Sequence, residues 1–137
     1  MRDLLRGARA LGALLVAGLL VTGCASSQLS IVVQSSKDTN EQRPFYVLVR
    51  SVDQPTYVAE AYQSVARRVM APDDSVLKAE VIYPGMKKQI DVPRQEKTPV
   101  AVYFLLTSPS GEWKTLIEQP LPGTVQLQLG ASRIEKP

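Results

Sequence analysis

From residue 29 onward, short runs of alternating apolar and polar residues follow one another, and each run ends at a proline, a glycine or a polar stretch. Alternation with a period of two is typical of β-strands that bury one face. The pattern predicts about seven strands, at 29–34, 45–52, 76–83, 88–92, 100–107, 113–119 and 125–129. The run 100–107 is the most apolar and is predicted to be the central core strand.

One segment has the spacing of an amphipathic helix instead. Five residues are predicted to form its core-facing side: Val58, Ala61, Tyr62, Val65 and Val69. Five others are predicted to face solvent: Glu60, Gln63, Ser64, Arg67 and Arg68. Thr56 is the expected N-cap and Pro72 the expected end. The fold class predicted from these patterns is mainly β, an antiparallel β-sandwich with one inserted helix.

The two ends of the chain differ from this pattern. Three arginines (Arg2, Arg6 and Arg9) precede an apolar run at 10–21, and small residues follow it. This layout is typical of a signal peptide, and the run is shorter than the roughly 20 residues that a membrane-spanning helix needs. At the other end, the segment 131–137 is polar apart from Ile134 and is predicted to fray.

Cys24 directly follows Val21-Thr22-Gly23 and is the only cysteine of the chain. The four residues resemble a bacterial lipobox, in which the cysteine is lipidated and the signal is cut just before it. A lone cysteine has no internal disulfide partner, whereas a lipid anchor explains its presence. The alternative is that Cys24 is a small apolar residue near the end of the signal. Residue 25 is Ala and not Asp, which in this motif favours the outer membrane.

The predicted organisation is a cleaved signal at 1–23, a lipidated N-terminus with a short tether at 24–28, and a β-sandwich domain at 29–137. Removing 1–23 discards three arginines and one aspartate, which leaves 13 basic and 12 acidic residues. This near-neutral balance does not indicate nucleic-acid binding.

The chain has no histidine, which disfavours zinc, copper or haem sites and Ser-His or Cys-His catalysis. Asp73 and Asp74 follow Pro72 and are predicted to form a turn, because they lack the further ligands of a calcium site. Trp113 is predicted to be an aromatic at the edge of the core. We expect no enzyme activity, no cofactor and no small-molecule substrate.

The order of these pieces resembles the TssJ (SciN) family, the outer-membrane lipoproteins of the type VI secretion system. The resemblance rests on Cys24, the strand 29–33, Asn40 before Arg43-Pro44, Val47-x-Val49-Arg50, the helical segment 57–69, Val81-Ile82-Tyr83-Pro84-Gly85, the strand 100–104, Trp113-Lys114, and the turn at 121–122 into 125–129. It implies a transthyretin-like β-sandwich, anchored on the periplasmic face of the outer membrane through acylated Cys24. The implied partner is an inner-membrane TssM-type subunit, bound by its periplasmic C-terminal region.

In that family the loop between the first two strands contacts the partner. The resemblance assigns this role to six residues here: Lys37, Asp38, Thr39, Asn40, Glu41 and Gln42. The loop is wholly polar, so we expect it to bury nothing against the core and to make a polar contact that sets specificity. Alternatives are a merely solvated loop, or an interface on the helix face with Arg67 and Arg68.

Two other functions remain open at this stage. One is a pilotin-like lipoprotein that escorts a partner of another secretion system to the outer membrane. The other is a periplasmic module for a small apolar ligand or a glycan, which would need a concave pocket lined with aromatic side chains.

Overall fold

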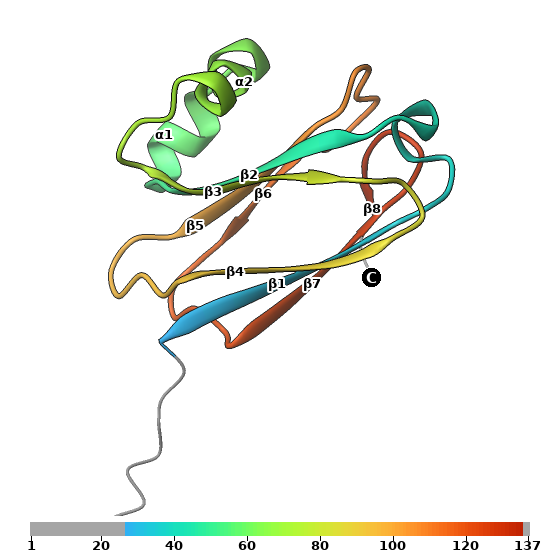
Figure 1. The fold of residues 1–137 in the computed structure, drawn as a ribbon. Coiled ribbons are helices and arrows are strands. Elements are labelled where there is room, and N and C mark those ends of the chain that lie inside the picture. The colour runs from blue at the N-terminus through green and yellow to red at the C-terminus, as the bar shows by residue number, and fades with distance from the viewer. Residues whose placement is uncertain (1–26, 136–137) are drawn as a thin grey trace, which may run out of the picture.

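The computed structural model describes residues 27–135, which form two four-stranded sheets packed face to face, with two short helices on one outer face (Figure 1). The first sheet has the order β4 (Lys87–Pro93), β1 (Gln28–Ser35), β7 (Thr124–Leu129) and β8 (Ile134–Glu135). The second has the order β3 (Val76–Ile82), β2 (Phe45–Ser51), β5 (Val100–Leu105) and β6 (Lys114–Ile117). Helices α1 (Gln54–Ala59) and α2 (Tyr62–Met70) connect β2 to β3. The predicted sandwich is confirmed.

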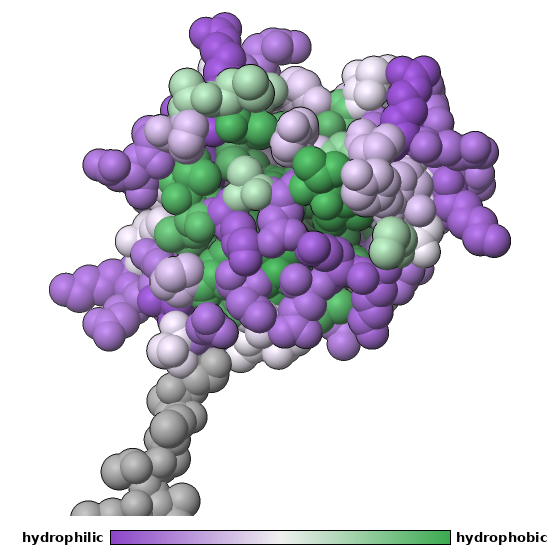
Figure 2. Space-filling model, in the orientation of Figure 1, coloured by the Kyte–Doolittle hydropathy of each residue, from purple (hydrophilic) through white to green (hydrophobic). Residues whose placement is uncertain are grey.

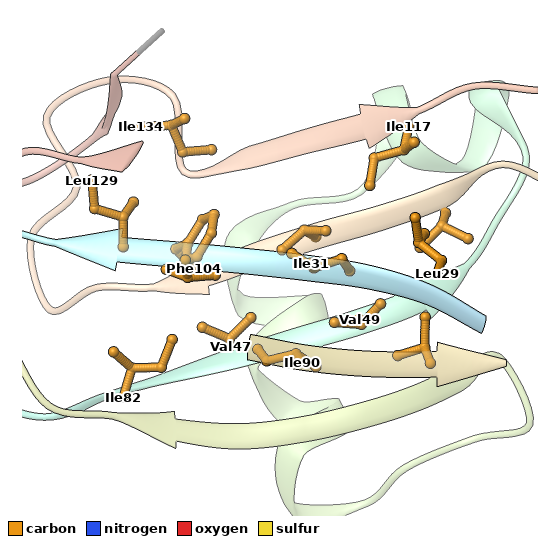
Figure 3. Close-up of a cluster of buried hydrophobic side chains, with 14 of the residues drawn as sticks. Leu29, Ile31, Val47, Val49, Ile82, Ile90, Phe104, Ile117, Leu129 and Ile134 are labelled. Carbon is orange, nitrogen blue, oxygen red and sulfur yellow. The ribbon is translucent and has the colours of Figure 1, made fainter. Parts of the chain in front are cut away.

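Alternating side chains of β1 provide the centre of the core. Leu29, Ile31 and Val33 are fully buried between the sheets, while the residues between them face outward. Val47 and Phe104 of the opposite sheet belong to the same cluster (Figure 3). Burying one such side chain contributes about 1.5–3 kcal/mol, so the inner faces of β1, β2 and β5 account for much of the stability of the sandwich.

One sheet is mixed, although an antiparallel sandwich was expected. β1 pairs antiparallel with β4 on one side but parallel with β7 on the other, from Ser30 opposite Thr124 to Ser35 opposite Leu129. The alternation of apolar residues has the same period in both kinds of pair and carries no information on strand direction. The parallel pair forms because the chain crosses from β6 in the second sheet before it adds β7 to the first.

The predicted single helix is two helices, broken at Glu60 and Ala61, where the backbone is extended. Asp53, and not Thr56, caps α1: its carboxylate accepts a hydrogen bond from the Thr56 amide at 2.8 Å. The break places Val58 in solvent, 68% exposed, whereas Val65 is buried as predicted. The expected solvent position of Glu60 is also wrong, because its side chain is only 9% exposed.

The C-terminal segment does not fray within the described residues. Ile134 is buried and pairs with Leu129, so that β8 continues the first sheet. A single apolar residue in a polar stretch gave too weak a sequence signal for a strand, but it fills the end of the core once β7 is in place.

A buried ionic cluster joins the helical segment to the second sheet. Arg50 of β2 donates to Glu60 Oε1 at 2.5 Å and to Ser75 Oγ at 2.8 Å. The Tyr103 hydroxyl of β5 donates to the other Glu60 oxygen at 2.7 Å. Desolvation is the largest single influence on the pKa of Glu60 and raises it, but the bonds from Arg50 and Tyr103 and the charges of Arg50 and Arg68 outweigh it and lower the pKa below its usual value.

We expect Glu60→Ala to lower the free energy of unfolding by about 3 kcal/mol, because it leaves the Arg50 guanidinium buried without its carboxylate. Urea denaturation measures the loss. The matched control is Glu41→Ala, which removes a carboxylate paired with Arg43 at the surface, where both side chains are 62% exposed; a surface pair contributes about 1 kcal/mol or less.

The pH dependence gives a second readout of the same cluster. The pKa of Glu60 is lower in the folded protein than its ordinary value of 4.5. Its stabilising effect is therefore present above pH 4.5 and is lost as the pH falls through the folded-state pKa. The difference in stability between the wild type and Glu60→Ala should shrink over that interval. A difference that stays constant into strong acid would contradict an ionic role for Glu60.

Candidate partner-binding site

Four connections of the sandwich meet at one end. Strands β1, β3, β5 and β7 all run toward it, and they are followed by the segments 36–44, 83–86, 106–113 and 130–133. The loop 36–44, which contains the six residues assigned to partner contact, lies at this end. β1 begins at Gln28 at the opposite end of the sandwich (Figure 1).

Thr39 and Asn40 hold the loop against its neighbours. The Thr39 hydroxyl donates to the carbonyl of Gly130 at 2.8 Å, and the Asn40 amide donates to the carbonyl of Ala131, also at 2.8 Å. The Asn40 side-chain oxygen accepts from the Thr107 amide at 2.7 Å. The loop is thereby bonded to both the β7–β8 and the β5–β6 connections.

Asn40 also determines the local path of the backbone. Asn40, Glu41 and Gln42 have φ values of 53°, 55° and 64°, in the left-handed region, which asparagine adopts more readily than most residues. The Asn40 side-chain amide donates to the carbonyls of Arg43 and Pro44, both at 3.2 Å. These bonds close a tight turn that directs the chain into β2.

The expectation that this loop buries nothing is therefore wrong for two of its residues. Thr39 is completely buried and Asn40 is 5% exposed. Polar side chains can be buried when hydrogen bonds satisfy them, and the partners here come from distant parts of the chain, which the local sequence does not reveal. Lys37, Asp38, Glu41 and Gln42 are exposed, as expected for contact residues.

The turn between β3 and β4 lies beside this loop. The buried Ser35 hydroxyl accepts from the Gly85 amide at 3.1 Å and lies 3.3 Å from the carbonyl of Met86. Gly85 has a φ of +83°, and a Cβ atom there would lie 3.3 Å from the side chain of Lys37. The sequence predicted a turn at Pro84-Gly85, but it did not indicate that this turn extends the surface of the loop.

The other candidate residues lie elsewhere. Arg68 bonds to the Asp73 carboxylate at 2.8 Å, and that carboxylate also accepts from the Ser75 amide at 2.9 Å, which confirms the predicted turn. Arg67 is exposed near the end of α2. Trp113 packs edge-on against Tyr62 at 5.0 Å between ring centroids, which confirms a core-edge role.

One surface depression is lined in part by two aromatic side chains, those of Tyr57 and Trp113. The ammonium group of Lys114 lies 4.5 Å from the centre of the Tyr57 ring and donates to the Tyr57 carbonyl at 2.5 Å. The protein's own cation thus occupies the ring face that a ligand would use. Within residues 27–135, no three His, Cys, Asp or Glu side chains are grouped so as to hold a metal ion.

Cys24 and the predicted signal at 1–23 lie outside the described residues, so their roles remain predictions. In the part of the chain that the structure does describe, neither helix has the length and apolar character needed to span a membrane.

Solved structures with the same fold include membrane and secretion proteins. One is Serratia marcescens Lip, a membrane-bound component of the type VI secretion system, with 14% identity over 80% of this chain and 96% of that chain, at a TM-score of 0.65. Another is the type VI lipoprotein TssJ1 from Pseudomonas aeruginosa, with 13% identity, coverage of 80% and 93%, and a TM-score of 0.60. At these identities the similarity establishes the fold.

A third match is a chain in a structure described as the TssM C-terminal domain (869–1107) from EAEC, with 12% identity, coverage of 79% and 95%, and a TM-score of 0.63. The aligned part, 79% of 137 residues or about 108 residues, covers 95% of the matched chain. The matched chain therefore has about 114 residues, fewer than the 239 residues of the TssM segment 869–1107. No curated protein matches the sequence.

A family model gives the assignment at the level of sequence. The model of the IglE N-terminal domain matches residues 46–129, from the second residue of β2 to the end of β7. This match covers more than half of the chain, and the protein therefore belongs to the family of IglE N-terminal domains.

Proposed function

We propose that this protein is a lipid-anchored subunit of a type VI secretion membrane complex and that it binds the periplasmic C-terminal region of a TssM-type inner-membrane protein. The observation that carries the proposal is the shared fold with Lip and TssJ1 over at least 93% of those chains. The lipobox-like residues before Cys24 supply the anchor that such a subunit needs. The outer membrane is the proposed location, because residue 25 is not an aspartate.

The geometry supports this arrangement. β1 starts four residues after Cys24 and ends at the candidate loop. Eight residues of strand, at about 3.3 Å each, separate the two ends of the sandwich by roughly 25 Å. An anchor at Cys24 would hold the first end near the membrane, and the loop would then face the periplasm, from which a partner based in the inner membrane must approach.

The anchor is tested with Cys24→Ser in the full chain. We expect this variant to take up no labelled palmitate and to keep its signal at 1–23, because the thiol that takes up the lipid is gone and the cut before residue 24 depends on it. Ala25→Asp is the matched control: it should keep the label and shift the protein toward the inner-membrane fraction. Uptake of labelled palmitate by the serine variant, or no uptake by the wild type, would refute lipid anchorage through Cys24.

The partner contact is tested with the four exposed loop residues alone. The variant combines Lys37→Ser, Asp38→Ser, Glu41→Asn and Gln42→Asn, with asparagine used where φ is positive. We expect it to keep the stability of the wild type and to lose at least about 90% of the TssM-type protein that co-purifies from detergent-solubilised envelopes, because a few interface residues usually dominate binding.

The control for this experiment replaces Arg67 and Gln63 of α2 with serine, which should leave co-purification unchanged. The opposite result, with loss through the α2 variant and none through the loop variant, would move the interface to the helices. Recovery of an outer-membrane ring protein in place of the TssM-type protein would favour a pilotin-like function.

Asn40 is expected to act on stability instead. Asn40→Ala removes three hydrogen bonds to backbone atoms and leaves buried groups unpaired, so we expect a loss of about 3 kcal/mol in the free energy of unfolding. Gln42→Ala is the matched control, since its φ is also positive but its side chain is exposed; it should cost less than about 1 kcal/mol. Equal losses in the two variants would show that Asn40 acts only through its backbone conformation.

A further inference from the structure

Four large apolar or aromatic side chains are exposed next to the candidate loop. Tyr46, Val81, Tyr83 and Met86, which we call the Tyr83 patch, are 44%, 39%, 59% and 56% exposed. Tyr46 and Val81 are directly opposite each other on β2 and β3. Val81, Tyr83 and Met86 line one shallow hollow together with Lys87 and Lys88. Figure 2 shows apolar surface in several places between the hydrophilic side chains on one side of the molecule.

The helices leave this part of the second sheet uncovered. α2 packs against Leu48 and Tyr103 through Val65, which accounts for the buried outer face of that sheet. Tyr46 and Val81 lie beyond this cluster, toward the end where the loops meet. Single exposed apolar residues are common on protein surfaces, but a contiguous group of them marks an interaction site.

The patch is held in a defined shape before any partner binds. Ser35 bonds to the Gly85 amide, and the Met86 amide donates to the Tyr83 carbonyl at 3.3 Å, which closes the turn between the two exposed side chains. The side chain of Lys37 packs over Gly85, so the turn and the candidate loop form one surface. A pre-formed surface loses little conformational entropy on binding.

The surroundings of the patch are mainly cationic. Lys88 and Lys78 share the carboxylate of Glu80, at 3.0 and 3.2 Å. Lys37 and Lys87 form no ion pair within the part of the chain that the structure describes. A complementary partner would therefore place carboxylates around an apolar side chain.

We propose that the Tyr83 patch is the apolar centre of the interface and that it receives an acidic segment of the partner protein, with a large apolar side chain in the hollow beside Tyr83 and carboxylates near Lys37 and Lys87. The inference rests on the proposed function for the identity of the partner. The Tyr83 patch supplies an apolar contact that loses its water on binding, which the exposed residues of the polar loop cannot supply. A protein segment fits better than a lipid surface, because the patch lies at the end of the sandwich opposite to the start of β1.

The test uses the full-length lipoprotein in native envelopes, with the photo-crosslinking amino acid p-benzoylphenylalanine in place of Tyr83 or, as the matched control, of Met70. Met70 is 85% exposed on α2, away from the patch. We expect a crosslink from position 83, and none from position 70, to a peptide of the TssM-type protein that is rich in carboxylates. Adding Lys37→Glu and Lys87→Glu should reduce the yield of this crosslink at least about tenfold.

A second measurement tests the apolar contact without the crosslinker. Tyr83→Ser with Met86→Ser should reduce co-purification of the partner at least about tenfold. Val58→Ser with Met70→Ser, which removes two still more exposed apolar side chains from the helices, should not reduce it. Circular dichroism and urea denaturation check that both double variants fold.

The outcomes separate this inference from the proposed function. Undiminished co-purification by the Tyr83→Ser, Met86→Ser variant, together with loss by the loop variant, overturns the patch and keeps the function. A crosslink from position 83 to lipid only overturns the patch in favour of a membrane contact. A charge-dependent crosslink to an acidic segment of a different protein keeps the patch and rejects the TssM-type partner.

Discussion

The packing of β1 against β2 and β5 across the sandwich is the constraint on which the rest of the structure depends. β1 lies inside its sheet with strands on both sides, and every second residue is buried against the opposite sheet. A shift of one residue would expose Leu29, Ile31 and Val33 together, so the register is strongly determined. The same strand connects the end nearest Cys24 to the end where the four loops meet, and it therefore places the N-terminal side of the domain and the candidate loop at opposite ends of the sandwich.

Buried polar interactions fix the helical segment and the loop 36–44 on this sandwich. Glu60 accepts hydrogen bonds from Arg50 and Tyr103 and so holds the break between α1 and α2 over the second sheet. Asn40 holds the loop at the other end of the sandwich in the same way, because its side chain bonds to the backbone of three other residues. Buried groups of this kind are costly when a partner is missing, and this gives each segment one preferred position.

The similarity to Lip and TssJ1 at 14% and 13% identity has a simple physical basis. A sandwich requires apolar residues of suitable volume at alternate positions, and many sequences meet that requirement. Binding depends on the loops and exposed side chains that the scaffold carries, and these can change while the scaffold is kept. The family match begins at Tyr46 and includes the Tyr83 patch, whereas the loop 37–42 and Cys24 lie before it.

The sequence by itself determined where the strands lie and that they form a sandwich, because alternation and turn residues are local signals. It indicated Val65 as a core residue and Lys37, Asp38, Glu41 and Gln42 as exposed. Only the tertiary structure decided the parallel pairing of β1 with β7, the break at Glu60 and the strand at Ile134.

The tertiary structure also decided which residues of the candidate site are buried. Thr39 is buried because its hydroxyl bonds to Gly130, 91 residues away, and Asn40 because its side chain bonds to Thr107, 67 residues away. Tyr46 and Tyr83 belong to separate predicted strands, and only the pairing of β2 with β3 brings these two residues into one patch. Burial and surface continuity depend on contacts between distant residues, which a local pattern does not contain.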